Sequence, residues 1–186
     1  MSSELILHLD LDGVLTDFDS AFMKIAGGLT PDEYKAKHGR GTESSVFLNN
    51  GGDFFSNLDW IQGGKELLRF SLSHFKLVRI LSSAGTGKDW EKFKEVQAAK
   101  IGWLQKNAPQ IEKKNIIIVP FANLKARHAG PNRILVDDKD TTIKQWLLKG
   151  GIGILHRHSD WTKTIETLQS YASGPIKLKE IVESLR

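Results

Sequence analysis

Two carboxylates one residue apart, Asp10 and Asp12, are the side chains of this sequence best suited to chemistry. They end a short apolar run that begins at Leu5, and Gly13 follows them at once. Alternate side chains of a strand point to the same side, so both carboxylates are expected to face one ligand. At a separation of about 4 Å, two such charges repel by roughly 4 kcal/mol at an effective dielectric constant near 20. A hard divalent cation relieves that repulsion, and the pair therefore predicts a Mg²⁺ site.

Other polar side chains follow later apolar runs or lie between them, namely Ser82 and Ser83, Lys125, and Asp137 and Asp138. In a doubly wound parallel sheet the ligand lies beyond the carboxyl ends of the strands. We therefore expect these groups to meet the first acid pair at one edge of a sheet. Lys100 and Arg127 are alternatives to Lys125 as the cation of that site.

Strand-like and helix-like segments alternate along the chain, which predicts an α/β fold with a Rossmann-like parallel sheet of about five strands flanked by helices. The expected strands are residues 4–10, 76–81, 115–119, 133–136 and 152–155. The first expected helix begins at residue 17 or 19 and ends at residue 26. The other expected helices are residues 30–37, 64–74, 89–107, 139–149, 161–172 and 176–185. Gly13 permits the sharp turn by which the chain leaves the first strand.

Residues 27–58 have a different composition, with glycine pairs and aromatic residues between them. One short helix is expected here, because Thr30 is a good N-cap and Pro31 suits the first helical position. The remainder of the segment is expected to form loops. We interpret it as a small cap insertion (27–58) over a core domain made of residues 1–26 and 59–186.

The composition is that of an ordinary globular chain, with 186 residues, 40% hydrophobic and 26% charged. Because there is no cysteine, disulfides and thiolate metal sites are excluded, which is compatible with a cytoplasmic location. No apolar run approaches the length of a membrane span, so no membrane partner is expected, and a homodimer stays open. The net charge of +4 fits either a phosphorylated or polyanionic ligand or a lysine-rich surface.

The order of two acids, a hydroxyl, a lysine and an acid pair resembles that of the haloacid dehalogenase (HAD) superfamily of phosphatases. Residues 10–17 have the form Asp-x-Asp-Gly-Val/Thr-x-x-Asp in full. Within this superfamily the chain is most similar to the 5'(3')-deoxyribonucleotidases, over about residues 4–160. The similarity rests on residues 10–19, Phe54-Phe55, Ile80–Ser83, Lys100–Trp103 and Val136–Lys139. That family often has threonine in place of Ser82 and arginine in place of Lys139.

The resemblance implies a Mg²⁺-dependent phosphomonoester hydrolase that works through an aspartyl-phosphate and acts on a small phosphomonoester, a (deoxy)ribonucleoside monophosphate. Asp10 would be the nucleophile, and Asp12 would be the general acid and then the general base. Ser82 would hydrogen-bond the phosphate, with Ser83 as the alternative. Lys125 would neutralise charge on the phosphate and on the nucleophile.

The resemblance also implies a metal site and a substrate site. Mg²⁺ would be held by Asp10, Asp12 through its backbone carbonyl, and Asp137, with Asp138 close by. The expected substrate-binding residues are Gly13, Phe18 and Ser83, with Phe18 near the nucleobase. Other aromatic residues that would complete an apolar pocket are Phe22, Phe47, Phe54, Phe55 and Trp60.

Several alternatives remain open. The helix that follows Asp137-Asp138-Lys139, with Trp146 in it, also resembles the phosphatase domain of polynucleotide kinase phosphatases, which act on nucleic-acid 3'-phosphate ends. A sugar phosphatase, a catalytically silent phosphate-binding module and a receiver-like domain are further candidates. In receiver domains, however, the acid pair precedes the phosphorylated aspartate in the sequence, whereas here Asp10 and Asp12 come first and the acid pair Asp137-Asp138 comes last.

Two other motifs are incomplete. Gly85–Lys88 lacks the remaining positions of a phosphate-binding P-loop, because the motif's first glycine is replaced by serine and its final hydroxyl by Asp89. The stretch His156–His158 offers two imidazoles without a third ligand beside them in the sequence. We interpret both as ordinary loop segments.

Overall fold

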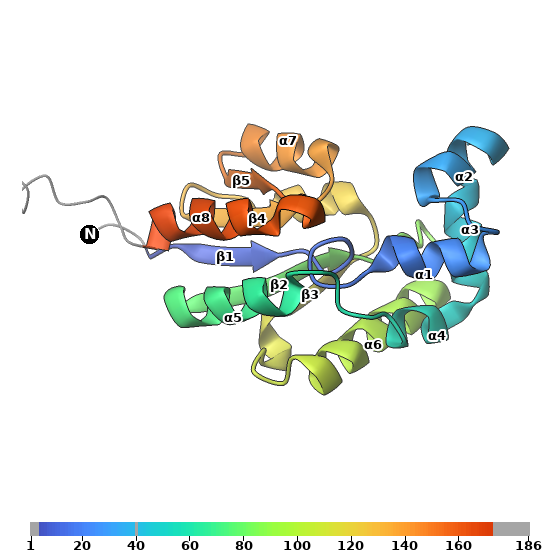
Figure 1. Cartoon of the computed structure of the whole chain (residues 1–186), viewed down its shortest axis with the longest axis horizontal. Helices are drawn as coiled ribbons and strands as arrows, with labels where there is room; N and C mark the ends of the chain where they lie inside the picture. The colour runs from blue at the N-terminus through green and yellow to red at the C-terminus, as the bar shows by residue number, and fades with distance from the viewer. Residues whose placement is uncertain (1–3, 40, 173–186) are drawn as a thin grey trace, which may run out of the picture.

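Five parallel strands form one sheet in the order β3-β2-β1-β4-β5, in a computed structural model that describes residues 4–39 and 41–172. The strands are β1 (Ile6–Leu9), β2 (Leu77–Ser83), β3 (Ile116–Val119), β4 (Arg133–Asp137) and β5 (Ile152–Leu155). Figure 1 shows them with helices around them. The predicted α/β class and the five-stranded parallel sheet are confirmed.

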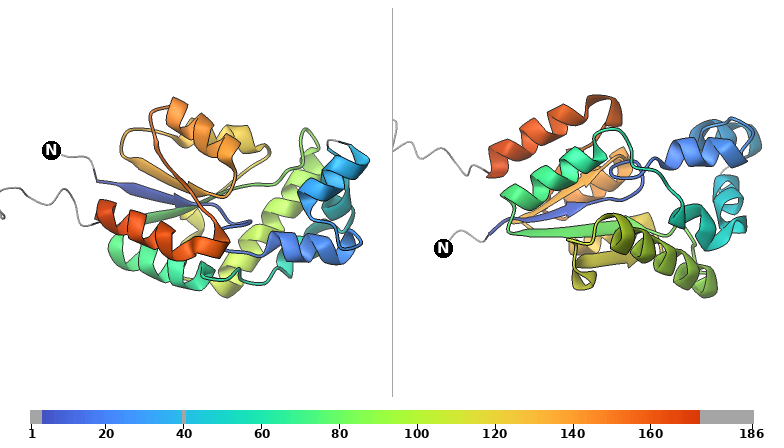
Figure 2. Two further views of the ribbon diagram at one scale, coloured as in Figure 1. Left: turned by 45° about the horizontal axis from the view of Figure 1, so that its top comes forward. Right: turned by 60° about the horizontal axis from the view of Figure 1, so that its bottom comes forward.

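The α-helices are α1 (Phe18–Ile25), α2 (Pro31–His38), α3 (Thr42–Asn49), α4 (Gly51–Ser56), α5 (Gly64–His74), α6 (Trp90–Asn107), α7 (Asp140–Leu148) and α8 (Trp161–Ala172). Short 3₁₀ helices occur at η1 (Lys113–Asn115), η2 (Ala122–His128) and η3 (His158–Asp160). Helices α5 and α8 lie side by side on one face of the sheet, while α7 packs on β4 and β5 from the other face (Figure 2). The helix expected at 176–185 lies outside the described residues.

The central strand β1 is buried as its apolar sequence predicts, with Leu7, His8 and Leu9 fully inaccessible to solvent. Its register places Leu9 opposite Ile80 of β2 and opposite Val136 of β4. The residues that follow these three positions therefore lie at the same end of the sheet, where β2 continues to Ser83. This register brings the polar strand ends together.

Three helix starts have side-chain caps, among them the Thr30 cap that the sequence predicts. The Asp17 side chain accepts a hydrogen bond from Ser20 N, and the Asp89 side chain accepts one from Lys92 N. Thr30 and Glu33 form a reciprocal capping box at the start of α2, with proline at the first helical position. These caps fix where α1, α2 and α6 begin.

The expectation that residues 27–58 form loops outside α2 is wrong, because α3 and α4 are helices. Phe47, Phe54 and Phe55 are buried, and their burial outweighs the low helix propensity of the neighbouring glycines. Gly51, with φ of 60°, lies at the junction between the two helices. Helices α1–α4 gather beyond the carboxyl ends of the strands (Figure 1), and α4 packs against α6. The division into core and cap stays a prediction.

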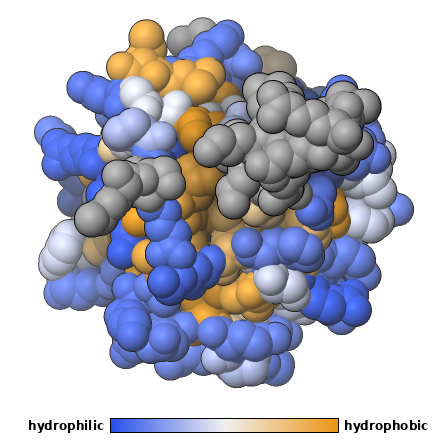
Figure 3. Space-filling view, turned by 90° about the vertical axis from the view of Figure 1, so that its left-hand side faces the viewer, coloured by the Kyte–Doolittle hydropathy of each residue, from blue (hydrophilic) through white to orange (hydrophobic). Residues whose placement is uncertain are grey.

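Figure 3 shows the end of the molecule at which the strands begin, which is opposite to helices α1–α4. Hydrophobic residues are visible in the middle of this face and hydrophilic residues surround them. Within residues 4–39 and 41–172, no helix combines the length and the apolar character that crossing a bilayer requires. The polar strand ends all lie at the far side of the sheet from this face.

Two buried histidines predict a pH-dependent contribution to stability. Burial lowers the pKa of His8 and of His156 to about 4. An unfolded chain binds protons at both sites below pH 6.5, whereas the folded chain does not until about pH 4, so each histidine lowers stability as the pH falls.

His8→Gln removes one of these sites. We expect its stability deficit relative to wild type to shrink by up to about 3 kcal/mol between pH 7 and pH 4, in urea unfolding followed by circular dichroism. The carboxylates titrate in both proteins and largely cancel in the difference. A deficit that is constant across this range would contradict the expectation.

Candidate active site

The first and fourth strands bring three carboxylates together. Asp10 directly follows β1, Asp137 ends β4, and Asp138 comes next in the chain. One carboxylate oxygen of each lies within 4.8 Å of the others. Asp10 is 5% exposed and Asp137 is fully buried, so their charges need partners inside the protein.

Lys125 is the cation between two of these acids. It lies on η2, beyond β3, and its Nζ is 2.6 Å from Asp10 Oδ2 and 2.7 Å from Asp137 Oδ2. Burial alone lowers the pKa of Lys125, but the two carboxylates more than reverse this and raise it above its usual value. Burial and the charge of Asp10 raise the pKa of Asp137 to about 7, although Lys125 opposes this.

A second buried lysine, Lys100 on α6, serves the other acid. Its Nζ is 2.5 Å from Asp12 Oδ2, 3.2 Å from Ser82 Oγ and 2.7 Å from the carbonyl oxygen of Ser83. Burial raises the pKa of Asp12, and the charge of Lys100 opposes that rise. The two lysines that sequence analysis treated as alternatives therefore hold different carboxylates. Arg127, the third residue considered as the cation of the site, is exposed on η2.

The three carboxylates have the chemistry of a site for a hard divalent cation. Asp138 Oδ2 lies 3.1 Å from Lys139 Nζ, but Asp138 Oδ1 is buried and has no hydrogen-bond partner in the described chain. Burial also raises the pKa of Asp138. An ion with oxygen ligands would satisfy this atom and offset the repulsion among the three acids. Asp12 is outside the group, and its side chain is held by Lys100.

Among the residues that the structure describes, no other three His, Asp or Glu side chains come close enough to share an ion. This includes the stretch His156–His158. The His156 ring contacts Thr164 Oγ1 at 2.9 Å through Nδ1, and His156 is buried. These histidines do not belong to the group of carboxylates described above.

A cavity of about 350 Å³ opens over the carboxylates. The floor is formed by residues from the strand ends and η2, namely Asp10, Asp12, Ser83, Lys125 and Asp138. Gly13 also lines it, with φ of 74°, and a Cβ there would come within 2.7 Å of Asp138 Oδ2. Only glycine fits this turn, because the conformation and the close approach both exclude a side chain.

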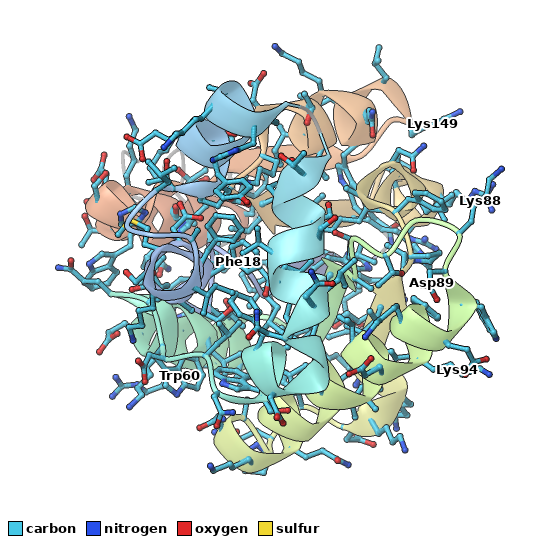
Figure 4. All side chains as sticks on the ribbon, turned by 90° about the vertical axis from the view of Figure 1, so that its right-hand side faces the viewer. Phe18, Trp60, Lys88, Asp89, Lys94 and Lys149 are labelled. Atoms are coloured by element: carbon cyan, nitrogen blue, oxygen red, sulfur yellow. The ribbon has the colours of Figure 1, made fainter. Side chains whose placement is uncertain are left out.

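The two serines after β2 take different positions. Ser83 lines the cavity, whereas Ser82 is 1% exposed and contacts Lys100 behind the cavity floor. Gly85 also lines the cavity, but Lys88 is exposed. In Figure 4, Lys88 and Asp89 lie at the edge of the face on which Phe18 is near the centre. The segment 85–88 therefore does not form a P-loop around the site.

Three aromatic residues from α1, α3 and α4 form an apolar wall of the cavity: Phe18, Phe47 and Phe55. The ring centroids of Phe18 and Phe47 are 5.4 Å apart. Phe22 and Phe54 pack behind this wall and do not line the cavity. Trp60 does not belong to the aromatic wall either. Its ring centroid lies 4.9 Å from that of Trp103, and its side chain borders another cavity.

Sequence analysis missed the contribution of α3 to the cavity, including that of Glu43. Glu43 and Phe47 both line the cavity and are four residues apart, which is the spacing that places two side chains on one face of a helix. That spacing was visible in the sequence. It was not used because the segment was expected to be a loop.

No protein-family model and no curated protein matches the chain. Among solved structures, a HAD family enzyme from Bacteroides thetaiotaomicron is 15% identical and has a TM-score of 0.44, with 87% of this chain and 98% of that chain covered. A HAD hydrolase, family IA, variant 3, from Entamoeba histolytica is 15% identical with a TM-score of 0.48, and 90% of each chain is covered. A HAD family hydrolase from Deinococcus radiodurans, with bound phosphate and sodium, is 13% identical with a TM-score of 0.47, over 92% of this chain and 90% of that chain.

Proposed function

We propose that this chain is a HAD-type, Mg²⁺-dependent phosphomonoesterase that works through an aspartyl-phosphate. The observation that supports this most directly is the position of Asp10. Its carboxylate lies on the floor of the cavity and is paired with a buried lysine. It is grouped with the carboxylate of Asp138, one oxygen of which has no partner in the described chain. The similarities to solved structures are too weak to bear on the activity, so the proposal rests on this geometry.

Both carboxylate oxygens of Asp10 have partners that hold the side chain in place. Its Oδ1 accepts a hydrogen bond of 2.7 Å from Leu11 N, and Lys125 lies against its Oδ2. In the first step a carboxylate oxygen of Asp10 would attack phosphorus and form the aspartyl-phosphate, while the bond to the ester oxygen breaks.

Asp12 has the properties of a general acid and base. Burial raises the pKa of Asp12, which favours the protonated form that would donate a proton to the leaving oxygen in the first step, and Lys100 opposes this rise. The resulting carboxylate would then take a proton from the water that attacks the phosphoenzyme. Lys100 would hold the side chain in place, since its Nζ bonds both Asp12 and the end of β2.

The residues that would hold Mg²⁺ are Asp10, Asp137 and Asp138, whose carboxylates lie together. The family resemblance adds the backbone carbonyl of Asp12 as a further ligand. When bound, the ion would neutralise negative charge so that an anionic carboxylate can approach an anionic phosphate. Lys125 would add positive charge on the protein side, and Ser83, which lines the cavity, would donate a hydrogen bond to the phosphate.

The aromatic wall favours a substrate with a flat apolar group attached to the phosphate. Phe18, Phe47 and Phe55 offer such a surface in the same cavity, whose volume of about 350 Å³ suits a small molecule. This supports (deoxy)ribonucleoside monophosphates, and thus the activity of a 5'(3')-deoxyribonucleotidase. Six carboxylates and three lysines line the cavity, so a polyanionic nucleic-acid end is the weaker candidate.

The test is phosphate release from a panel of esters with Mg²⁺ and after chelation. The panel contains 5'- and 3'-mononucleotides, sugar phosphates and a 3'-phosphorylated oligonucleotide. We expect Mg²⁺-dependent release that is at least about tenfold faster from mononucleotides than from the other two groups. Faster release from the oligonucleotide, with a steep loss as salt is added, would favour the nucleic-acid alternative. The absence of any release with Mg²⁺ would contradict the proposed function.

A further inference from the structure

Glu43 presents an unusual carboxylate to the cavity. It lies in the first turn of α3 and lines the cavity that contains Asp10. Its Oε2 atom is buried and has no hydrogen-bond partner among the described residues. A buried carboxylate oxygen without a donor is unfavourable, because it loses hydration and gains no hydrogen bond in return. This oxygen is therefore available to accept a hydrogen bond from a bound molecule.

The cations of the cavity are already engaged elsewhere. Lys35 lies 2.8 Å from Asp32, and Lys139 lies 3.1 Å from Asp138. Lys125 bridges Asp10 and Asp137, and Glu43 forms no ion pair with any of the described residues. The three lysines that line the cavity are thus committed to other carboxylates. The donor that Glu43 lacks would come from a bound molecule.

The residues around Glu43 indicate which kind of molecule could donate this hydrogen bond. Phe47, one turn further along α3, lines the same cavity and contacts the Phe18 ring edge-on at 5.4 Å. A flat ligand against these rings would present its edge to neighbouring polar atoms, and a carboxylate accepts hydrogen bonds from amino and hydroxyl groups. A second anionic group on the ligand would be repelled, because carboxylates outnumber lysines two to one in the lining.

We propose that Glu43 is a specificity residue that accepts a hydrogen bond from an N–H or O–H group on the leaving part of the substrate. The inference rests on the proposed function and adds to it the substrate class, a monoester whose leaving group is neutral, has a flat apolar face and carries donors at its edge. In a nucleotide the donor is either an amino or ring N–H of the base or a hydroxyl of the sugar.

The experiment compares wild type with Glu43→Gln, which keeps the size of the side chain and removes its charge. Substrates are guanosine and inosine monophosphates, which differ by one amino group, each as the ribo and the 2'-deoxy form. Phenyl phosphate serves as an aromatic monoester without such donors. Glu66→Gln on α5 is the matched control, because Glu66 is exposed and does not line the cavity.

We expect Glu43→Gln to lower kcat/KM for the preferred nucleotide about ten- to hundredfold relative to phenyl phosphate, mainly through KM. A loss that depends on the 2-amino group assigns the contact to the base, and one that depends on the 2'-hydroxyl assigns it to the sugar. Glu66→Gln should match wild type. The melting temperature of Glu43→Gln should equal or exceed that of wild type, because the change removes a charge from a side chain whose Oε2 atom is buried without a partner.

A nucleotide-to-phenyl-phosphate ratio that changes less than twofold overturns the role of Glu43 and leaves the proposed function intact. So does a melting temperature that falls by more than about 5 °C, since that indicates a structural role. If wild type hydrolyses no monoester, the proposed function fails, and calorimetric binding of the same nucleotides decides on Glu43. Equal dissociation constants for wild type and Glu43→Gln would then overturn the inference.

Discussion

Asp10→Asn is expected to reduce phosphate release by about 10⁴-fold or more, with Mg²⁺ present and at saturating nucleotide. An amide is a poor nucleophile, and the substitution also removes one of the two carboxylates that hold Lys125. The reduction should appear in kcat, because the lost interaction is made with phosphorus in the reaction itself. Phosphate release measured over hours, with enzyme at micromolar concentration, gives the sensitivity that this test requires.

The variant should remain folded, because Asp137 still pairs with Lys125 at 2.7 Å and the repulsion between Asp10 and Asp137 disappears. Unfolding by urea checks this directly. Asp140→Asn is the matched control, since Asp140 is exposed at the start of α7 and pairs with Lys144. Asp140→Asn should retain wild-type turnover. If Asp10→Asn keeps activity within about tenfold of wild type, Asp10 is not the nucleophile.

The sheet and its polar edge follow from sequence patterns that are local. Apolar runs ended by acids or hydroxyls mark the ends of β1, β2 and β4, and parallel strands present their carboxyl ends at one edge. The convergence of Asp10 and Asp137 on one point was therefore predictable. The N-caps Asp17 and Asp89 were equally readable, because a cap depends on the three residues that follow it.

Local sequence patterns do not give the partners of the two buried lysines, although the family resemblance implied that Lys125 meets Asp10. The helical period places Lys100 on the buried face of α6, between Val96 and Leu104, but it does not give the partner of Nζ. Lys125 lies on the 3₁₀ helix η2, which is too short to show such a period. The contact of Lys100 with Asp12 joins residues 88 positions apart, which depends on how α6 packs. The difference between Ser82 and Ser83 arises from the same packing, since Lys100 contacts the Ser82 hydroxyl behind the cavity floor.

Helices α3 and α4 show a different limit. Their glycines and asparagines favour turns, and their helical state depends on burying Phe47, Phe54 and Phe55 against one another and against their surroundings. The Phe54 and Phe55 ring centroids are 5.0 Å apart. Such tertiary stabilisation is absent from a local pattern. This is also why Glu43 was not recognised as a residue of the cavity.

Lys125→Met is expected to lower the free energy of unfolding by about 3 to 5 kcal/mol at pH 8 without divalent cations. Methionine replaces the length of the lysine but leaves Asp10 and Asp137 facing each other in a buried site with no positive charge between them. Lys144→Met is the control, because Lys144 is exposed and its pairing with Asp140 is worth at most about 1 kcal/mol. Urea unfolding of both variants and wild type gives the comparison.

The loss should shrink as the pH falls from 8 to 6. Burial and Asp10 already raise the pKa of Asp137 to about 7, and Lys125 opposes that rise, so its removal raises the pKa further. The folded variant then binds a proton that the unfolded chain does not, and its stability increases as the pH decreases.

Mg²⁺ should restore part of the stability at pH 8, because the ion supplies the missing positive charge, but it should not restore turnover if Lys125 also acts on the phosphate. A Lys125→Met protein that is as stable as wild type at pH 8 would show that the two carboxylates are not both charged there, and the electrostatic account of this site would then be wrong.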